Sequence, residues 1–563
     1  MNGLAISVWD VAIILGYFAL TIAFGVWAGR AKIRTAEQLF LADREASWPL
    51  VGASLFSANI SSQQFVGQAG LAFSIGLAAG AFQLVGAMCF IFLAVFFVDV
   101  YLGLKLTTAP EFFERRYGTG TRLFVAAINV VMILAANLTA ALYAGATVLT
   151  DLVGWNSGGQ FMLAAVAIAA GAGLCAIFGG LRSVLWFDLM QATVLVFGGV
   201  LTLCCTVIKA GGWSVLSGLY DSQGINLWSV VQPWTHPFGW LSLATGAVIL
   251  GVHGHCTDHD YVQRALAAKN LFHSKLGALF ASFLKIVALF IIAAPGVVAA
   301  KLLPAGTAPD RVYAQLVTGY IPAGFIGLVL AGLLAAILGS MASGLSAVSS
   351  MLTFDFAVKL APSLSDRRRV QLGRVIMFAV LVVCVLCAPL IGRYQGLYAY
   401  LVKTWSLLAP PVFVCVVAGV FTRGATNAGA IATLVTGAAL GAIAFVALDQ
   451  PAIVSALPVY LQAPLNVGFV ITLACAGVMW LISRRSGPPA PAGSAVAAWK
   501  KETTAENTMT ARERRIYRLA LLGVGLLLAG VTLAFSPWGL ARPAANFSAP
   551  SAKPPSATPT PAH

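Results

Sequence analysis

The chain has 563 residues, of which 59% are hydrophobic and 9% are charged, and its mean hydropathy is +0.89. This composition leaves too little polar surface for a soluble protein of that length, so we predict an all-α, polytopic membrane protein in contact with the lipid bilayer. The formal net charge of +15 does not indicate nucleic acid as a partner, because the basic residues lie between apolar runs and act as topology signals.

Apolar runs of about 20 residues, the length that spans the hydrocarbon core, recur between charged or Pro/Gly-rich breaks. Because lipid offers the backbone no hydrogen-bond partner, each run is expected to be helical, and any unwound part must face protein or a cavity. We predict fourteen spans, at roughly residues 9–29, 48–73, 75–100, 122–150, 160–180, 185–207, 240–257, 273–303, 323–356, 370–392, 396–422, 425–447, 462–483 and 516–536.

The basic residues also predict how the spans are oriented. With the N-terminus placed outside and the loops assigned alternately, most of the 34 Lys and Arg residues fall in inside-facing segments. This asymmetry follows the positive-inside rule. We therefore expect a multi-pass protein of the cell (plasma or inner) membrane with both termini outside.

The second span has a polar middle that includes Ser57, Asn59 and Gln64, with Gly67 and Gly70 close behind. Side chains that compete for backbone hydrogen bonds, together with glycine, predict a helix that is broken there and exposes carbonyl groups to a cation. The alternative is that Ser and Gln side chains form hydrogen bonds between helices. The residues alone leave both open.

Asp188 stands just inside the sixth span, where a carboxylate needs a counter-charge. A bound cation would supply it. The alternatives are solvation near the mouth of the helix or an ion pair with Arg182, six residues earlier.

The segment GVHGHCTDHD contains His253, His255 and His259, and the last two have the i, i+4 spacing of zinc ligands. One hypothesis is therefore a membrane metalloenzyme. We favour a second, in which His253 and His255 line a solute cavity and their charge makes uptake depend on pH.

Lys285 lies within an apolar stretch long enough to cross a bilayer. A cation at membrane depth costs about 2.5–3.5 kcal/mol on insertion scales, so it is expected to face a wet cavity or a bound solute. The alternative is a side chain that snorkels to the interface. This residue makes the chain a transport candidate.

The ninth span presents small and hydroxylated residues at three- and four-residue steps along one helical face. Such a face permits close helix packing, and its hydroxyl oxygens also suit a hard cation such as sodium. Its members are Gly339, Ala342, Ser343, Ser346, Ser349 and Ser350.

The last segments carry no expected domain of their own. Residues 486–510 form a polar loop, and the Pro/Ala/Ser-rich residues 541–563 are expected to be disordered. A sensor, the third functional class considered, would therefore need a separate signalling partner.

Six blocks in order and with fitting spacing resemble the sodium/solute symporter family, and within it the sodium/glucose (sugar) cotransporter branch. They are GASLFSANISSQQFVG, GGLRSVLWFDLMQ, CTDHDYVQRALAAKN, FLKIVALFIIAAPGVVA, the serine-rich span ending SSMLTFDF, and APPVFVCVVAGVFTRGATNAGA. The resemblance implies a LeuT-type five-plus-five inverted repeat with extra helices at both ends. We expect a first helix and cytoplasmic loop at 1–47, repeats at 48–238 and 239–422, additional helices at 423–540, and the tail.

The resemblance also implies sodium (Na+) as the transported coupling ion. Its site carries over to the carbonyls of Ser57, Ile60 and Ala336 and to the hydroxyl of Ser340. Gly339 stands where relatives usually have the first serine of a pair, so one hydroxyl ligand is missing, and we expect either a weaker site or a water in its place. A second sodium site of some relatives would fall on Asp188 and Ser343.

Solute contacts carry over less completely. Asn59, Gln64 and Lys285 stand at sugar-contacting positions of the glucose and galactose relatives, but Gln83 replaces a glutamate and Val402 replaces a glutamine. The resemblance therefore implies substrate contacts from Asn59, Gln64, Gln83 and Lys285.

The tyrosine-tryptophan pair that closes over sugar in those relatives appears here as Gly254-His255. Sialic-acid relatives use an arginine in the span at 122–150, and no Arg or Lys occurs between Leu123 and Asp151. We expect sodium-coupled import of a neutral sugar or polyol by alternating access, for which a monomer suffices. The alternative within the class is another solute, such as an amino acid or an organic acid.

Overall fold

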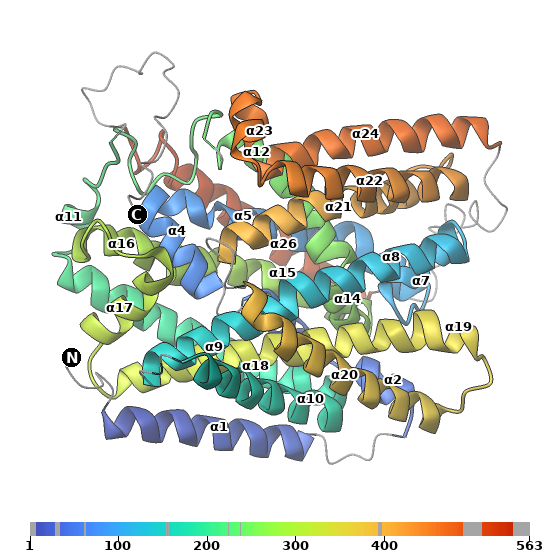
Figure 1. Ribbon diagram of the computed structural model, residues 1–563, viewed down its shortest axis with the longest axis horizontal. Coiled ribbons are helices and arrows are strands. Elements are labelled where there is room, and N and C mark those ends of the chain that lie inside the picture. The colour runs from blue at the N-terminus through green and yellow to red at the C-terminus, as the bar shows by residue number, and fades with distance from the viewer. Residues whose placement is uncertain are drawn as a thin grey trace.

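The computed structural model describes residues 7–28, 34–60, 64–153, 155, 157–222, 224–236, 238–391, 397–487 and 509–543. Throughout these residues the regular structure is helical, apart from the isolated bridges Ala46–Ala268 and Tyr220–Asn226. The predicted all-α class is confirmed, and the long helices run roughly side by side through one bundle (Figure 1).

The N-terminal half of the chain forms the helices α1 to α13, of which α1 lies at the surface. They are α1 Val8–Ala28, α2 Ala36–Leu41, α3 Trp48–Asn59, α4 Ala69–Ile75, α5 Ala81–Phe92, α6 Val98–Gly103, α7 Ala109–Arg116, α8 Thr119–Met132, α9 Thr139–Val153, α10 Gly158–Lys209, α11 Trp213–Leu216, α12 Trp240–Ser242 and α13 Val248–Val252.

The helices of the C-terminal half follow. They are α14 His259–Leu266, α15 Leu271–Ala288, α16 Ala294–Leu302, α17 Val312–Tyr320, α18 Phe325–Met351, α19 Val358–Leu360, α20 Asp366–Ile391, α21 Leu397–Phe421, α22 Asn427–Ala447, α23 Pro451–Ala456, α24 Pro464–Arg485 and α26 Ala511–Ala534. One-turn π segments extend several helices: η2 Gln64–Gln68, η4 Leu93–Phe97, η5 Ile133–Leu138, η6 Leu243–Ala247, η7 His253–Thr257, η8 Leu289–Ala293 and η10 Leu352–Ala357.

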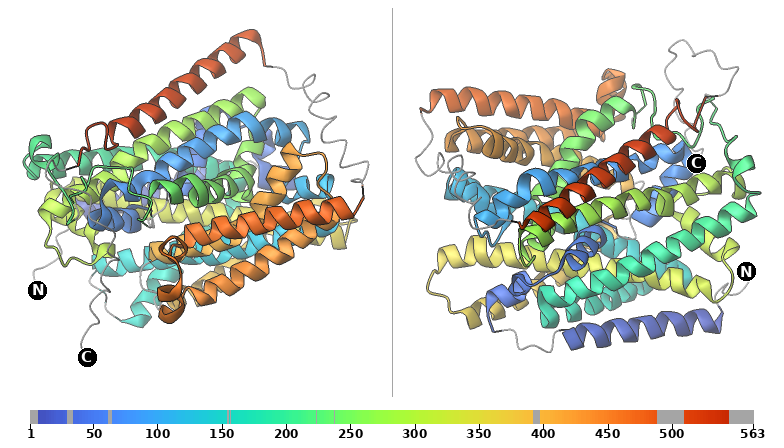
Figure 2. Two further views of the ribbon diagram at one scale, coloured as in Figure 1. Left: turned by 90° about the horizontal axis from the view of Figure 1, so that it is seen from above. Right: turned by 180° about the vertical axis from the view of Figure 1, so that it is seen from behind.

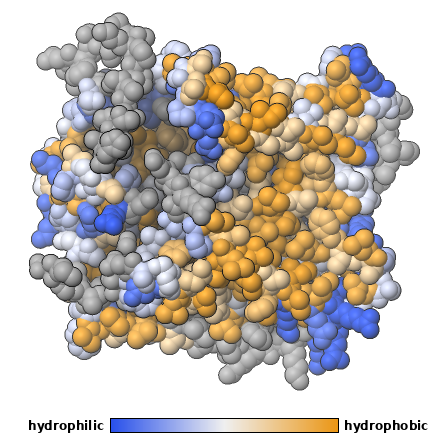
Figure 3. Space-filling model, in the orientation of Figure 1, coloured by the Kyte–Doolittle hydropathy of each residue, from blue (hydrophilic) through white to orange (hydrophobic). Residues whose placement is uncertain are grey.

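Ten continuous helices in the described residues are long and apolar enough to cross a membrane, and Val8–Tyr17 and Gly158–Leu174 are shorter apolar helices. The predicted count of fourteen is therefore not reached by length and composition. The fifth and sixth predicted spans meet at Gly180, whose φ of 58° is a left-handed, non-helical conformation that favours glycine, so the range of α10 comprises two helices on either side of a kink. Hydrophobic residues cover the middle of the surface seen in Figure 3, and hydrophilic residues gather toward its ends.

Two helices are interrupted in the middle of the bundle. Helix α3 ends at Asn59, Ile60 is extended with ψ 99°, and the helix resumes with η2 at Gln64. In the same way η7 ends at Thr257, Asp258 is extended with ψ 128°, and α14 begins at His259. The break predicted in the second span is thus present, although residues 61–63 lie outside the described part of the chain.

Small residues allow helices to cross closely near the first break. A side-chain carbon on Gly52 of α3 would lie 2.6 Å from the carbonyl oxygen of Gly277 in α15, so only glycine fits there. Helix α3 also packs against α10, and α10 lies along α18. These four helices place the break at Asn59 in the interior of the protein.

The chain enters and leaves the bundle at one end. Helix α1 begins and α26 ends at the same end, opposite α2, α7 and α19 (Figures 1 and 2). The basic residues of α7, Arg115 and Arg116, lie at that opposite end. Which end faces the cytoplasm stays a prediction from the distribution of charge.

Candidate functional site

A cavity of about 110 Å³ lies where the two interrupted helices meet. This volume holds more than one water molecule. All six predicted solute-contacting residues line it, namely Asn59, Gln64, Gln83, His253, His255 and Lys285, and so do Ser340, Val402 and Gly254. Tyr261 and Trp405 also line the cavity. The sequence analysis missed them because neither is a charged or amide residue that interrupts a predicted apolar span.

Lys285 is held inside this cavity by amide side chains. It is 2% exposed, and its Nζ donates to Asn59 Oδ1 and, over 2.7 Å, to Gln83 Oε1. The snorkelling alternative is therefore wrong. An ammonium has three donors, so the third is available to a solute.

A chain of glutamines supports the lysine. Gln83 Nε2 donates to Gln64 Oε1 over 2.9 Å and to Gln68 Oε1 over 2.6 Å. Asn59 Nδ2 donates to the hydroxyl of Tyr261 over 2.8 Å. The polar cavity wall thus draws on α3, η2, α5, α14 and α15, and it joins residues on both sides of each helix break.

The histidines divide between two places. His255 Nδ1 lies 2.8 Å from the carbonyl oxygen of Gly251, and His253 Nδ1 lies 2.8 Å from Thr257 Oγ1, while both Nε2 atoms are buried without a partner. His259, by contrast, has Nε2 2.5 Å from Ser350 Oγ and accepts at Nδ1 from a backbone amide.

The proposed zinc cluster of three histidines is therefore not assembled. Among the residues that the structure describes, no group of three or more His, Cys, Asp or Glu side chains is placed to hold a metal ion.

Unpartnered oxygen atoms gather where α10 faces α18. Asp188 Oδ1, Gln191 Oε1, Ser340 Oγ and Ser343 Oγ are each buried without a hydrogen-bond partner. Ser57 Oγ donates to the backbone oxygen of Asp188 over 2.8 Å and so joins α3 to the same region. Oxygen ligands suit a hard cation such as sodium. The remaining predicted positions, Ile60 and Ala336, are fully buried.

Asp188 has a protein counter-charge that the sequence reasoning missed. Arg264 Nη2 lies 3.5 Å from Asp188 Oδ2, and Arg264 Nη1 lies 2.8 Å from Asp260 Oδ1. Ser54 Oγ accepts from Arg264 Nε over 2.8 Å and donates to Asp188. The suggested partner, Arg182, instead lies 3.9 Å from Glu45.

Arg264 lies between the predicted spans at 240–257 and 273–303, so it counted among the inside-facing basic residues of the sequence analysis, but it is fully buried. The reason is that the chain folds back into the protein as α14 after the break at Asp258. When ionised, Asp188 and Asp260 outweigh Arg264 by one negative charge, which a bound cation would balance.

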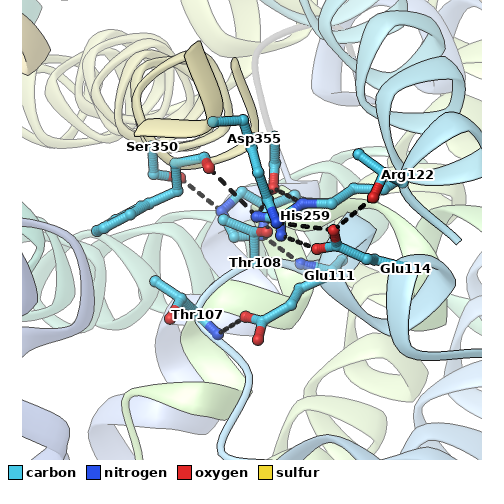
Figure 4. A network of polar contacts seen from close by, with 12 residues as sticks. Thr107, Thr108, Glu111, Glu114, Arg122, His259, Ser350 and Asp355 are labelled. Atoms are coloured by element: carbon cyan, nitrogen blue, oxygen red, sulfur yellow. Dashed lines mark hydrogen bonds and ion pairs between the residues drawn. The ribbon is translucent and has the colours of Figure 1, made fainter. Parts of the chain in front are cut away.

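A second polar network lies beyond α14 and links neighbouring helices there (Figure 4). Arg122 Nε donates to Asp355 Oδ1 over 2.7 Å, Thr108 Oγ1 donates to the same oxygen over 2.7 Å, and Arg122 also pairs with Glu114. Lys359 Nζ lies 2.7 Å from Glu114 Oε1. The network joins α7 and α8 to α18 and its extension.

Glu114 is the member of this network on the short helix α7, outside the candidate spans. Partial burial alone would raise the pKa of its carboxyl group. The bonds from Lys359 and Arg122 outweigh that effect and lower the pKa to about 2.

Comparisons with known proteins identify relatives of this chain. Residues 39–437 match the profile of the Sodium:solute symporter family. The sodium/myo-inositol cotransporter 2 of Mus musculus is 29% identical over 523 residues, which cover 84% of this chain and 76% of the relative. The sodium/glucose cotransporter of Vibrio parahaemolyticus is 29% identical, with 76% and 83% covered, and the sodium/mannose cotransporter of Bos taurus is 31% identical, with 78% and 79% covered.

The fold has solved counterparts as well. The substrate-bound, outward-open structure of a Na+-coupled sialic acid symporter superposes with a TM-score of 0.73 at 18% identity, covering 86% of this chain and 99% of that one. A closed structure of MHP1, a nucleobase-cation-symport-1 family transporter, superposes with a TM-score of 0.50 at 14% identity, covering 82% and 98%. Because the family profile spans most of the chain, the protein belongs to the sodium:solute symporter family, whose members are transporters rather than enzymes.

Proposed function

We propose that this protein imports a small neutral sugar or polyol together with sodium by alternating access. The observation that carries the proposal is the cavity at the two helix breaks, which is lined both by Lys285 and by Ser340 of the predicted sodium site. The relatives described above are named for the cotransport of myo-inositol, glucose and mannose with sodium. The protein acts in the cell membrane, with both termini outside, as a monomer.

The charge of the cavity wall favours a neutral solute. Lys285 is opposed there by Asp258, which also lines the cavity, whereas Asp260 is paired with Arg264. When Lys285 and Asp258 are ionised their charges balance, so the cavity wall offers no excess positive charge to an organic acid. The amide side chains of Asn59 and Gln83 and the free donor of Lys285 offer the hydrogen bonds that hydroxyl groups use.

Sodium coupling follows from the position of the oxygen cluster. Sodium that binds between α3, α10 and α18 fixes the end of α3, and α3 carries Asn59 to the solute. The solute in turn holds Asn59 and Lys285 in one arrangement. Each ligand raises the affinity for the other by the same factor, because binding free energies are linked.

Alternation requires that one end of the bundle open as the other closes. In this structure the contacts of Arg122 and Glu114 with Asp355 and Lys359 hold α7 and α8 against α18 and α19. Release of these contacts opens the path toward the end that the basic residues predict to be cytoplasmic. The extended residues Ile60 and Asp258 are the hinges of this motion.

The test is uptake into vesicles that contain the purified protein. An inward sodium gradient should drive accumulation of labelled myo-inositol, glucose or mannose, and an equal potassium gradient should not. Competition by unlabelled sugars, polyols, amino acids and organic acids then ranks the solutes. Equal uptake with sodium and potassium would contradict sodium coupling, and stronger competition by an amino acid or an organic acid would contradict the solute class.

A further inference from the structure

Gly339 in α18 stands where the sodium site has lost a hydroxyl, and a residue from another helix fills the space. A side-chain carbon built on Gly339 would lie 2.0 Å from Oε1 of Gln191 in α10. That distance is far shorter than any contact between non-bonded atoms. The amide oxygen of Gln191 therefore occupies the volume that a serine side chain would take.

Gln191 lacks the partners that a buried amide normally has. Its side chain is fully buried, and neither Oε1 nor Nε2 forms a hydrogen bond. Nearly all buried polar side-chain atoms in proteins are hydrogen-bonded, so an exception of this kind needs an explanation. Packing does not provide one, because leucine would fill a similar volume without burying polar atoms.

The surroundings of Gln191 show what its oxygen is available for. Asp188 Oδ1, one helical turn earlier, is buried and unpartnered, and so are the hydroxyl oxygens of Ser340 and Ser343 across the helix interface. Unpartnered oxygens from two helices thus lie in one region. A carbonyl oxygen is a good ligand for a hard cation and adds no charge.

We propose that Gln191 Oε1 is a sodium ligand that replaces the hydroxyl missing at Gly339. This inference rests on the proposed sodium coupling and adds a ligand from α10 to those implied on α3 and α18. Sodium then holds three helices together, and the buried amide oxygen of Gln191 has a partner only when the ion is bound.

The proposal separates sodium binding from structural stability. Gln191→Leu keeps the volume and removes the oxygen. Replacing a buried, unpaired polar group with an apolar group of similar shape is neutral or stabilising. We therefore expect a melting temperature in sodium-free buffer at or above that of the wild type, together with a loss of the stabilisation that sodium gives.

A serine on α18 can also supply the oxygen ligand that the Gln191 variants lose. In the double variant Gln191→Ala with Gly339→Ser, the alanine clears the space and the serine supplies a hydroxyl on α18. Gly332→Ser is the matched control, because Gly332 lies two turns earlier on α18 and faces Val194 of α10 rather than an oxygen atom. Thr193→Val, on α10 but exposed, controls for a change in that helix.

The experiment is a sodium titration of the purified full-length protein without solute, followed by tryptophan fluorescence and by thermal stability. Potassium replaces sodium in the reference at constant ionic strength. We expect the sodium Kd to rise at least tenfold in Gln191→Leu and in Gln191→Ala. It should return to within threefold of the wild type in the double variant, and it should stay within twofold in both controls.

Two outcomes would overturn the proposal while the wild type still binds sodium. One is a Kd within twofold of the wild type in Gln191→Leu, and the other is a double variant that binds no better than Gln191→Ala. A wild type that responds equally to sodium and potassium would instead refute the proposed sodium coupling. The two failures are therefore distinguishable.

Discussion

Replacement of Lys285 by methionine tests the role of the cavity most sharply, because it removes the ammonium and retains most of the side-chain volume. In the wild type, Nζ donates to Asn59 and to Gln83, and one donor remains for the solute. A hydrogen bond from a charged group contributes about 1.5–3 kcal/mol. Since about 1.4 kcal/mol corresponds to a factor of ten, we expect the solute Kd to rise roughly 10- to 140-fold.

The same helix offers a matched control. Lys275 in α15 is also buried, but its Nζ pairs with Asp99 at 2.6 Å, and it does not line the cavity. Lys275→Met removes a buried ammonium from α15 without touching the proposed solute site. Its solute Kd should stay within threefold of the wild type.

The assay is direct binding of labelled solute to the purified protein at saturating sodium, paired with a sodium titration in the absence of solute. Lys285→Met should weaken solute binding and leave the sodium Kd within twofold, because the two sites share no side chain that this change removes. A solute Kd within twofold of the wild type would refute the role of Lys285. A change of similar size in Lys275→Met would show that the effect is not specific to the cavity.

Three further changes test other parts of the account. Ser340→Ala should raise the sodium concentration for half-maximal uptake, and an unchanged value would remove this residue from the sodium site. Asp355→Asn removes the fully buried partner of Arg122 and leaves it only the partly exposed Glu114, so it should lower the free energy of unfolding by more than the about 0–1 kcal/mol expected for Lys359→Ala at the exposed edge. Equal losses would contradict this assignment.

The third change concerns pH. The pKa of Glu114 is lowered from 4.5 to about 2, so its contribution to stability is complete above 4.5 and is lost as the pH falls through 2. Glu114→Gln should flatten this part of the stability profile, and an unaltered slope in chemical denaturation would contradict it.

The sequence predicted the features that violate the rules of an apolar span. Lys285 and the polar run around Asn59 stand out because lipid tolerates neither a lone cation nor unpaired polar groups. The structure brings both to one cavity. They were predictable because each is an anomaly within a single segment.

The parts that could not be predicted depend on pairs of segments. Arg264 looked like a loop residue because assigning loops alternately cannot detect a chain that re-enters the protein after a break. Gln191 and Gly339 lie in different helices, and nothing in either segment shows that one fills the space beside the other. The count of fourteen spans is not confirmed, because in the described part of the chain the first and fifth predicted spans are present only as the shorter apolar helices Val8–Tyr17 and Gly158–Leu174.

The central claim is that sodium and a neutral solute bind together at the two helix breaks. The most direct test measures the solute Kd with and without sodium and the sodium Kd with and without solute, on the same purified protein. The account predicts that both affinities rise and that the two ratios are equal. A solute that binds equally well when sodium is replaced by potassium would contradict it.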